Sequence, residues 1–509
     1  MVTLIGLLAI FLVFSSSSTQ LPPVVAQSSG PLEDALGGKG FDVAFPGDPL
    51  FVSSTEAFNR RYSVKPAAVA FPSTSQQVGQ IVRAGYEFDY KVVARSGGHS
   101  YAAHGLGTED GAILIDLSRF KHLKVDTDTN TAVIGAGNRL GEIVLGLSQH
   151  GRALPHGTCA YVGWGGHATL GGYGFTSRLW GLSLDAIEEV EVVLGNGTAV
   201  VASQLQNRAL FAVPAPYLGI VTSIKVRTFA APPSATIFNF NWHLSIKDAT
   251  AAIAAYQRYV LTANIPAHLG IQGVITRASI QGNISFGLVG GWYGPSIELN
   301  GTLKGLIDAM PYPPRAMNFD TGDYLHSAEN LAGGSLDTTT PGGRDTFYAK
   351  SLITPSRSPL STAAIRAFVT TFATEGFASE LGWWFIQLDL FGGRNSAITK
   401  PSTSSTAFPH RDALFGIQLY GSTRDNVPPY PDSGFTFLDN AVNSILKNSP
   451  REWDYGAYTN YIDDRQPNGA SCLSYYKEGF ETIKRIKRVY DPKSVFAFPT
   501  RWLSEEVAV

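Results

Sequence analysis

The sequence predicts an α+β protein made of two domains, and three observations lead to this prediction. A chain of 509 residues, 44% of them hydrophobic, has enough apolar side chains for more than one core. Between about residues 64 and 229, short strands alternate with helices. Between about residues 235 and 444 the strands are long and rich in β-branched and aromatic residues, which is typical of an antiparallel sheet backed by helices.

The first region begins with a helix predicted over residues 73–86. Its start, Ser-Thr-Ser-Gln-Gln, contains hydroxyl side chains that cap helices, and Val78, Ile81 and Val82 recur at helical spacing. An Asn-Gly pair at Asn196 favours a tight turn between two strands. The other elements predicted here are strands at 91–94, 112–117, 131–135, 187–194, 198–201 and 220–228 and a helix at 140–150.

The second region is predicted to contain helices at residues 249–261 and 361–374 and a strand at 383–389. The stretch 392–432 is rich in Ser, Thr, Pro and Gly, which predicts mostly loop around one short apolar strand. A last helix is predicted over residues 475–490. No internal repeat interrupts this order, so the chain is not expected to be a repeat protein.

The net charge and the first residues indicate which partners and which location to expect. The net charge of −2 gives no reason to expect a nucleic-acid partner. Residues 2–14 are almost wholly apolar but too few to span a bilayer, so residues 1–26 are interpreted as a signal peptide, with a buried strand as the alternative. No later stretch suits a membrane anchor. Sequons at Asn196, Asn283 and Asn300 support a secreted, extracellular glycoprotein.

Two glycine-rich segments each contain one nucleophilic side chain. His99 lies in Arg-Ser-Gly-Gly-His-Ser-Tyr, and Cys159 lies in His-Gly-Thr-Cys just before the glycine-rich run 163–174. Glycines lack the Cβ atom that would block the approach of a large anionic cofactor, whose phosphates backbone N–H groups could then bind. The pattern Gly-x-Gly-x-x-Gly does not follow a first strand, which argues against a nicotinamide cofactor.

The two cysteines, Cys159 and Cys472, allow two interpretations. A secreted chain with two cysteines could join them in a disulfide. Alternatively, Cys159 holds a cofactor and Cys472 is a buried, inert thiol. These interpretations exclude each other, and the glycine-rich surroundings of Cys159 favour the second.

In this order the two segments resemble those of the berberine-bridge-type FAD oxidases, which belong to the vanillyl-alcohol oxidase fold family. The resemblance extends from about residue 59 to 502 and is greatest to secreted gluco- and chito-oligosaccharide oxidases. It implies a two-part FAD-binding domain of the vanillyl-alcohol oxidase/PCMH type, formed by residues 55–234 and by 445–509, which return to it. Residues 235–444 would form the substrate-binding domain.

The resemblance also implies a doubly attached FAD. The His99 imidazole would bond the flavin 8-methyl carbon and the Cys159 thiolate would bond ring carbon 6. The other cofactor contacts that it implies are Arg95, Ser96, Gly97, Gly98, Ser100, Thr158, Val162, Gly163, Gly166, His167, Gly171, Gly174, Ile220 and Asn460. One segment departs from the family pattern, because 207–221 is shorter and has Pro214 and Pro216, which remove two amide donors near the cofactor.

Strand alternation over 383–389 places Phe385, Gln387 and Asp389 on one face, while Trp384 on the other face is expected in the core. With an aromatic ring, an amide and a carboxyl on one face, this strand resembles the sugar-binding strands of the oligosaccharide oxidases. It departs from them at Phe385, where a tryptophan is expected. A solvated sheet face is the alternative. Further predicted sugar contacts are Tyr101, Gln272 and Gln418.

The segment 457–463 resembles the family's Tyr-x-Asn-Tyr-x-Asp, whose second tyrosine faces the flavin. This makes Tyr461 the candidate base and Tyr458 the runner-up. A phenol has a pKa of about 10, so Asp389 is expected to accept its hydrogen bond and receive its proton, or to orient it.

The resemblance predicts a monomeric, metal-free oxidase that converts the anomeric C1 hydroxyl of reducing-end oligosaccharides to a lactone and reduces O₂ to H₂O₂. The alternatives are a berberine-bridge-type oxidase or dehydrogenase of a secondary metabolite, and a non-enzymatic secreted carbohydrate-binding protein.

Overall fold

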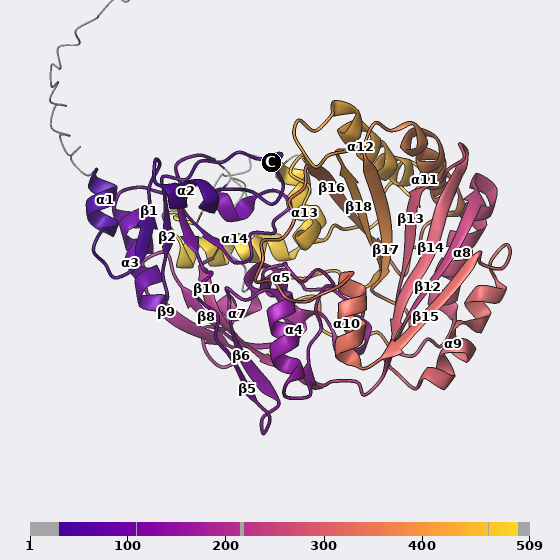
Figure 1. Cartoon of the computed structure of the whole chain (residues 1–509), viewed down its shortest axis with the longest axis horizontal. Helices are drawn as coiled ribbons and strands as arrows, with labels where there is room; N and C mark the ends of the chain where they lie inside the picture. Colours follow the sequence, from indigo (N-terminus) through magenta and orange to yellow (C-terminus); the bar gives the residue numbers. More distant parts are fainter. Residues whose placement is uncertain (1–29, 108, 214–217, 467, 497–509) are drawn as a thin grey trace, which may run out of the picture.

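The computed structural model describes residues 30–107, 109–213, 218–466 and 468–496. The predicted signal peptide and the two prolines of the departing segment lie outside these residues. Figure 1 shows two parts side by side, with the N-terminal elements in indigo and purple and a large sheet in pink, orange and brown. In the described part of the chain, none of the helices has the length and apolar character needed to cross a bilayer.

A small, mostly parallel sheet opens the first part. Its strand order is β1-β2-β4-β3, with β2 and β3 both parallel to β4 and β1 antiparallel at the edge. Helix α3 covers the sheet because Val78, Ile81 and Val82 are fully buried in the core that they share with β2 and β4. Thr74 caps this helix by accepting from the Gln77 N–H. The bounds are β1 Asp42–Ala44, β2 Ala68–Phe71, α3 Ser75–Glu87, β3 Val92–Arg95 and β4 Ile113–Asp116.

A second, antiparallel sheet completes this part, with the strand order β5-β6-β10-β8-β9. Asn196 and Gly197 form the expected turn between β8 and β9, and Gly197 has the positive φ of +77° that favours glycine. Every element predicted in this region is present, and its ends lie within two residues of those expected. The bounds are β5 Leu123–Asp126, β6 Thr131–Gly135, α4 Leu140–Ser148, β8 Ile187–Val193, β9 Ala199–Ser203 and β10 Ile220–Arg227.

Shorter elements surround these two sheets. Two short strands, β7 and β11, pair with each other. Of two short helices, α5 lies within the second glycine-rich segment and α6 follows it. The bounds are α1 Pro31–Leu36, α2 Pro49–Ser54, β7 Arg152–Ala153, α5 Trp164–Thr169, α6 Ser177–Trp180, α7 Arg208–Ala212 and β11 Phe229–Ala230.

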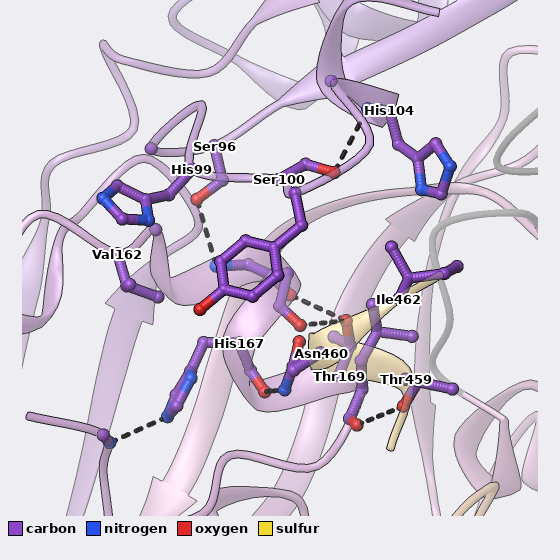
Figure 2. A pocket seen from close by; sticks show the side chains of 18 of the residues that line it. Ser96, His99, Ser100, His104, Val162, His167, Thr169, Thr459, Asn460 and Ile462 are labelled. Carbon is purple, nitrogen blue, oxygen red and sulfur yellow. Dashed lines mark hydrogen bonds between the residues drawn. The ribbon is translucent and has the colours of Figure 1, made fainter. Parts of the chain in front are cut away.

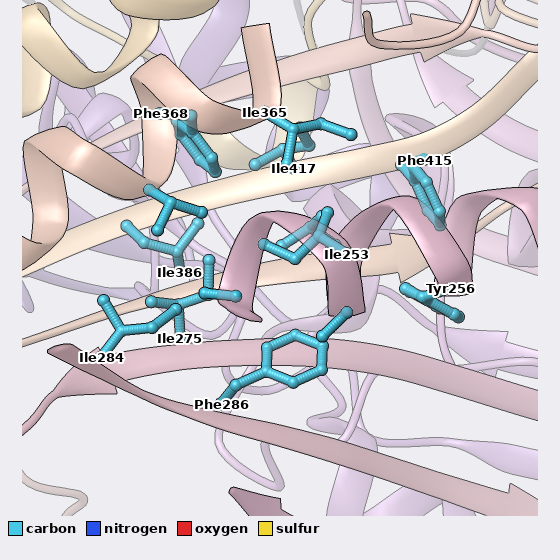
Figure 3. Close-up of a cluster of buried hydrophobic side chains, with 14 of the residues drawn as sticks. Ile253, Tyr256, Ile275, Ile284, Phe286, Ile365, Phe368, Ile386, Phe415 and Ile417 are labelled. Carbon is cyan, nitrogen blue, oxygen red and sulfur yellow. The ribbon is translucent and has the colours of Figure 1, made fainter. Parts of the chain in front are cut away.

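The second part is one seven-stranded antiparallel sheet, in the order β15-β12-β14-β13-β17-β18-β16. Helices pack on one face, and Figure 3 shows isoleucine and aromatic side chains of α8 and α11 against the sheet. This confirms the predicted sheet backed by helices. The bounds are β12 Ala235–Ser245, α8 Ile246–Thr262, β13 Leu269–Arg277, β14 Asn283–Trp292, α9 Ser296–Asp308, β15 Ala316–Gly322, α10 Tyr324–Ala332, β16 Phe347–Pro355, α11 Thr362–Thr371, β17 Trp383–Leu390, β18 Ala413–Ser422 and α12 Asp432–Leu446.

Two predictions about this half were wrong in detail. The strand expected to be short between 392 and 432 is β18, ten buried residues between β17 and β16, and its small residues Gly416 and Gly421 allow Phe391 and Leu381 to pack on it. The helix expected over 475–490 is broken. Lys477, with a left-handed φ of +47°, lies between α13 (Asn468–Tyr476) and α14 (Gly479–Tyr490), and its ammonium group bonds Asp454.

The end of the chain packs against its beginning. Helix α14 lies among the purple strands of the first part in Figure 1, and Phe480, Ile483 and Ile486 are buried in the core that contains β6, β8 and β10. Farther on, the Val92 N–H of β3 donates to the Val495 carbonyl over 2.8 Å.

Arg178 connects the two parts. This fully buried side chain of α6 donates to four backbone carbonyls of the second part, at distances between 2.6 and 3.0 Å. The four acceptors are the carbonyls of Pro266, Leu269, Gly392 and Arg394. Since a buried polar group is stable only when it is hydrogen-bonded, the guanidinium group and these carbonyls depend on each other.

Candidate active site

A cavity of about 390 Å³ lies where the two parts meet. The loop after β3, the second glycine-rich segment and the start of β10 line it from the first part. Strands β17 and β18 line it from the second part, and residues 458–462 come from the returning end of the chain. Figure 2 shows this pocket with His99, Val162, His167 and Asn460 around it. Six segments of the chain therefore converge on one cavity.

The side chain of His99 is a neutral imidazole, and one of its ring nitrogens makes no hydrogen bond to the described residues. Its ring stacks on Phe58 with 3.6 Å between centroids, and its Nδ1 atom is buried without a hydrogen-bond partner in the described part of the chain. Burial, with a smaller contribution from Arg139, lowers the pKa of His99 to about 4. At neutral pH the ring is therefore uncharged, and a neutral imidazole has a lone pair on one nitrogen, as a nucleophile requires.

Cys159 faces the same cavity. Its Sγ atom lies 3.8 Å from the His99 Nε2 atom, and its exposed surface belongs to the cavity lining. Burial raises the pKa of the thiol, while the backbone N–H groups of Tyr161 and Val162 act in the opposite direction. Cys472 is buried in the core that also contains α14, and the two cysteines form no disulfide. The disulfide interpretation is therefore wrong.

Most of the glycines serve contacts between loops. A Cβ atom on Gly163 would lie 2.0 Å from the Gly97 nitrogen, and one on Gly174 would lie 1.6 Å from the His156 carbonyl oxygen. Only the absence of a side chain allows these backbones to approach so closely. Gly166 differs, because a Cβ atom there would have no neighbour within 4 Å, and this glycine lines the cavity. Gly166 is thus the glycine whose missing side chain leaves room for a ligand.

His167 braces the second glycine-rich segment. Its Nε2 atom accepts from the Gly157 N–H over 3.1 Å, and burial lowers its pKa to about 3, so the ring is neutral. The Asn460 amide donates to the His167 carbonyl over 3.1 Å, and the Thr459 hydroxyl donates to the Leu170 carbonyl over 2.7 Å (Figure 2). These bonds fasten the returning chain segment to the loop that carries Cys159.

Most of the predicted cofactor contacts meet in this cavity. Ser96 shows how they are fixed, because its hydroxyl donates to the Ala136 carbonyl and accepts from the Gly165 N–H. Gly171 and Gly174 are the exceptions among the described residues, since they pack behind the lining. The predicted residues that line the cavity are Arg95, Ser96, Gly97, Gly98, His99, Ser100, Thr158, Cys159, Val162, Gly163, Gly166, His167, Ile220 and Asn460.

The sheet of the second part supplies an amide-rich wall. Gln387 of β17 and Gln418 of β18 are direct cross-strand neighbours, and both line the cavity. The Gln418 amide donates to the Tyr101 hydroxyl over 2.8 Å. Phe385 lines the cavity beside them, whereas Trp384 is buried in the core on the opposite face, which confirms the predicted alternation.

Tyr461, which is partly exposed, and the buried Asp389 form a pair. Tyr461 lines the cavity and its hydroxyl donates to the Asp389 carboxyl, of which Oδ2 has no partner in the described residues. Burial raises the pKa of Asp389 to about 8. Burial and the neighbouring Asp389 hold the pKa of Tyr461 well above its usual range. The phenol thus faces the ligand space with a basic carboxyl behind it.

Two predicted residues stand outside the lining of the described cavity. Asp389 lies behind Tyr461, and Gln272 is its cross-strand neighbour on β13. Tyr458, the runner-up base, is buried, and its hydroxyl accepts from the N–H groups of Gly172 and Tyr173 and from the Asn460 amide. Three donors fix this hydroxyl, so Tyr458 serves to hold the loops together.

Sequence reasoning missed three residues of the site. Phe58 stacks on His99 from a loop with no motif, so no signal marked it. His104, whose pKa burial lowers to about 4, lines the cavity just after the first glycine-rich segment. Tyr420 stacks on Phe385 with 5.0 Å between centroids. The alternation that places Gln418 on the cavity face also places Tyr420 there, so this residue could have been found.

Comparisons with known proteins agree with this geometry. Residues 66–203 match the family described as FAD binding domain, and residues 457–500 match the family described as berberine and berberine like. The carbohydrate oxidase of Microdochium nivale is 33% identical over 484 residues, which cover 92% of this chain and 94% of that protein.

Two solved structures are similar over nearly their whole length. The xylooligosaccharide oxidase from Myceliophthora thermophila C1, in complex with xylobiose, is 31% identical with a TM-score of 0.86 and covers 92% of this chain and 98% of its own. The glucooligosaccharide oxidase from Acremonium strictum, which carries 6-S-cysteinyl, 8α-N1-histidyl FAD, is 31% identical with a TM-score of 0.84 and the same coverage.

The fold and the cavity thus define an FAD-dependent oxidoreductase of the class that acts on CH–OH groups, with a PCMH-type FAD-binding fold. The chain belongs to the berberine-bridge-type FAD-linked oxidases. The residues present fit this cofactor, because the cavity holds an unpartnered imidazole nitrogen, a thiol beside it and the open cradle at Gly166. The alternative of a non-enzymatic binding protein does not agree with this assignment.

Proposed function

We propose that this enzyme oxidises the anomeric C1 hydroxyl of reducing-end oligosaccharides to a lactone while O₂ is reduced to H₂O₂. The observation that carries the proposal is the Tyr461 hydroxyl, which reaches the cavity with the buried Asp389 carboxyl behind it. The amide wall of Gln387 and Gln418 in the same cavity suits a polyhydroxylated ligand. The substrates in the names of the similar oxidases support the same class.

We propose that FAD is attached to both His99 and Cys159. The neutral imidazole with an unshared Nδ1 atom and the thiol 3.8 Å from the same ring support two attachments. The cysteinyl and histidyl bonds of the Acremonium strictum enzyme support the same pair. When bound, FAD supplies the acceptor for the hydride that C1 loses and the path of those electrons to O₂.

Tyr461 receives the proton of the anomeric hydroxyl. A phenolate beside an ionised carboxyl in a buried site would be costly, as the raised pKa of Tyr461 indicates. The phenol therefore passes its own proton to Asp389 while it accepts the proton of the substrate. With a pKa of about 8, the Asp389 carboxylate is a stronger base than an exposed one, so it is suited to hold this proton.

Gln387, Gln418 and Phe385 orient the sugar. An amide side chain both donates and accepts hydrogen bonds, and so does a sugar hydroxyl. Gln418 uses one N–H on Tyr101, which leaves its carbonyl oxygen for a sugar O–H. Phe385 offers an aromatic surface to the apolar face of the pyranose ring.

The test uses purified holoprotein. We expect a yellow colour that survives acid precipitation, and proteolytic peptides in which both His99 and Cys159 carry flavin mass. We also expect H₂O₂ and an aldonic acid, formed when the lactone opens, after addition of cellobiose or chitobiose. Tyr461→Phe should keep the colour and lose at least about 100-fold in kcat.

The outcomes separate the alternatives. Attached flavin without oxidation of any sugar would favour the alternative substrate class, a secondary metabolite. Peptides with a bare His99 or a bare Cys159 would refute the double attachment.

We also propose that the protein is exported and glycosylated. The acceptor side chains Asn196, in the turn between β8 and β9, and Asn300, on α9, are exposed, as N-glycans require. Expression of the full chain in a eukaryotic secretory host should yield medium-borne protein whose mass falls on treatment with an N-glycosidase. Retention of the whole product inside the cell would contradict export.

A further inference from the structure

Strand β17 leads from the buried Asp389 to the surface. The side chains of Asp389, Gln387, Phe385 and Trp383 alternate onto one face, and their neighbours along this face are about 7 Å apart. Their exposure increases in the same order. Asp389 is buried, Gln387 and Phe385 are partly exposed and line the cavity, and Trp383 is 45% exposed. The strand therefore marks a straight path from the reacting end of the cavity to the solvent.

Trp383 extends an aromatic surface that begins inside the cavity. Its ring stacks on Phe385 with 5.4 Å between centroids and 22° between planes, and it packs on Tyr420 at 5.2 Å. Phe385 in turn stacks on Tyr420. The three rings are all in contact with one another, which restricts their orientations, and together they are called the platform below. Trp383 is also the most exposed tryptophan in the part of the chain that the structure describes.

We propose that Trp383 binds a sugar unit beyond the one that reacts, and so gives the enzyme a preference for longer chains. This inference rests on the function proposed above. If C1 of the terminal unit lies at Tyr461, the rest of an oligosaccharide must leave the cavity toward solvent. One step along the strand face, about 7 Å, is comparable to the length of one pyranose unit. Trp383, one step beyond Phe385 on the strand face, is therefore in the position of the next unit.

The chemistry of the platform fits a pyranose. A sugar ring in a linear chain has an apolar face of C–H groups, and aromatic rings bury such faces without competing for hydroxyl hydrogen bonds. Trp383 offers no charge and its ring is already oriented, so little rotamer entropy is lost when a ligand binds. The contact is made equally in the ground state and the transition state. It should therefore act on KM and leave kcat unchanged.

The experiment compares Trp383→Ala with the wild-type holoenzyme on a monosaccharide and on the matching di-, tri- and tetrasaccharides. We expect unchanged kcat/KM for the monosaccharide and a five- to tenfold loss for the longer chains, through KM, which is the range of one aromatic contact. Trp383→Phe should retain most of the longer-chain activity.

Phe319→Ala is the matched control. Phe319 is equally exposed, at 45%, and lies on β15 at the far edge of the same sheet. This variant should behave as the wild type on every sugar.

Three outcomes would overturn the inference or its basis. Equal loss on the monosaccharide and the tetrasaccharide would show that Trp383 only supports the site. The absence of any loss would refute the inference and leave the proposed oxidation standing. If the wild-type holoenzyme oxidises none of the sugars, the proposed function fails, and the role of Trp383 fails with it.

Discussion

Replacement of Asp389 by asparagine should change how activity depends on pH. The wild-type carboxyl has a pKa of about 8, so its ionised form is the minor one at neutral pH. If this carboxylate receives the proton that Tyr461 passes on, kcat/KM should fall about tenfold for each pH unit below 8 and reach about 1% of its plateau at pH 6. Asparagine cannot receive the proton. We therefore expect a flat profile, about 100- to 10,000-fold below the wild-type plateau.

The same group should make stability depend on pH. Burial raises the pKa of Asp389 from 3.8 to about 8, so between these values the folded state holds a proton that the unfolded state has lost. The free energy of unfolding therefore falls as pH rises through this window, by about 1.4 kcal/mol per unit, and stays constant above pH 8. The total is on the order of 5 kcal/mol. An asparagine side chain does not titrate, so Asp389→Asn should gain stability relative to the wild type between pH 5 and pH 9.

Two assays test this reasoning. Peroxide formation by the holoenzyme between pH 5.5 and 9.5 gives the activity profile, and denaturant unfolding at pH 5 and pH 9 gives the difference in stability. A wild-type activity that stays constant from pH 8 down to pH 5.5 would mean that Asp389 is an ordinary carboxylate. An Asp389→Asn variant that keeps the wild-type limb would show that another group titrates. Either result would refute the proton path through Tyr461.

Three further predictions concern attachment and stability. His99→Ala and Cys159→Ser should each keep a flavin attached to the remaining residue, which is visible as colour after acid precipitation. The double variant should release the flavin. Release of the flavin from either single variant would contradict two independent bonds. Arg178→Met should lower the free energy of unfolding by about 3–5 kcal/mol in denaturant, because four buried carbonyls lose a charged donor. A decrease below about 1 kcal/mol would refute the role of Arg178 in connecting the two parts. Gly163→Ala should fold poorly because its Cβ atom meets the Gly97 nitrogen, whereas Gly166→Ala, with open space around it, should melt at or above the wild-type temperature.

The local elements were predictable because periodicity and turn residues determine them. The helix α3 and the Asn-Gly turn at Asn196 follow from short-range signals and lie where expected. The break at Lys477 was missed because Tyr476, Phe480 and Ile483 keep helical spacing across it. The sequence also identified His99, Cys159 and the cavity face of β17.

The sequence alone did not show which backbone contacts the glycines allow, or which site residues line the cavity and which lie behind its lining. Gly97 and Gly163 are conspicuous in sequence, but the structure shows that each makes room for the other's loop. That Asp389 lies behind Tyr461, with Gln272 as its neighbour, depends on the register between β13 and β17, which no local pattern determines. Burial then gives Asp389 its unusual pKa, so this property too arises only from the assembled fold.

The contact of α14 and Val495 with the first part has a consequence for synthesis on the ribosome. The core around β6, β8 and β10 lacks Phe480, Ile483 and Ile486 until α14 is translated, after all the strands of both sheets. By then the seven-stranded sheet, which needs none of these residues, has already emerged and is free to form. We therefore expect nascent chains stalled before residue 475 to contain a folded sheet but to acquire no flavin, so that cofactor insertion follows the synthesis of α14.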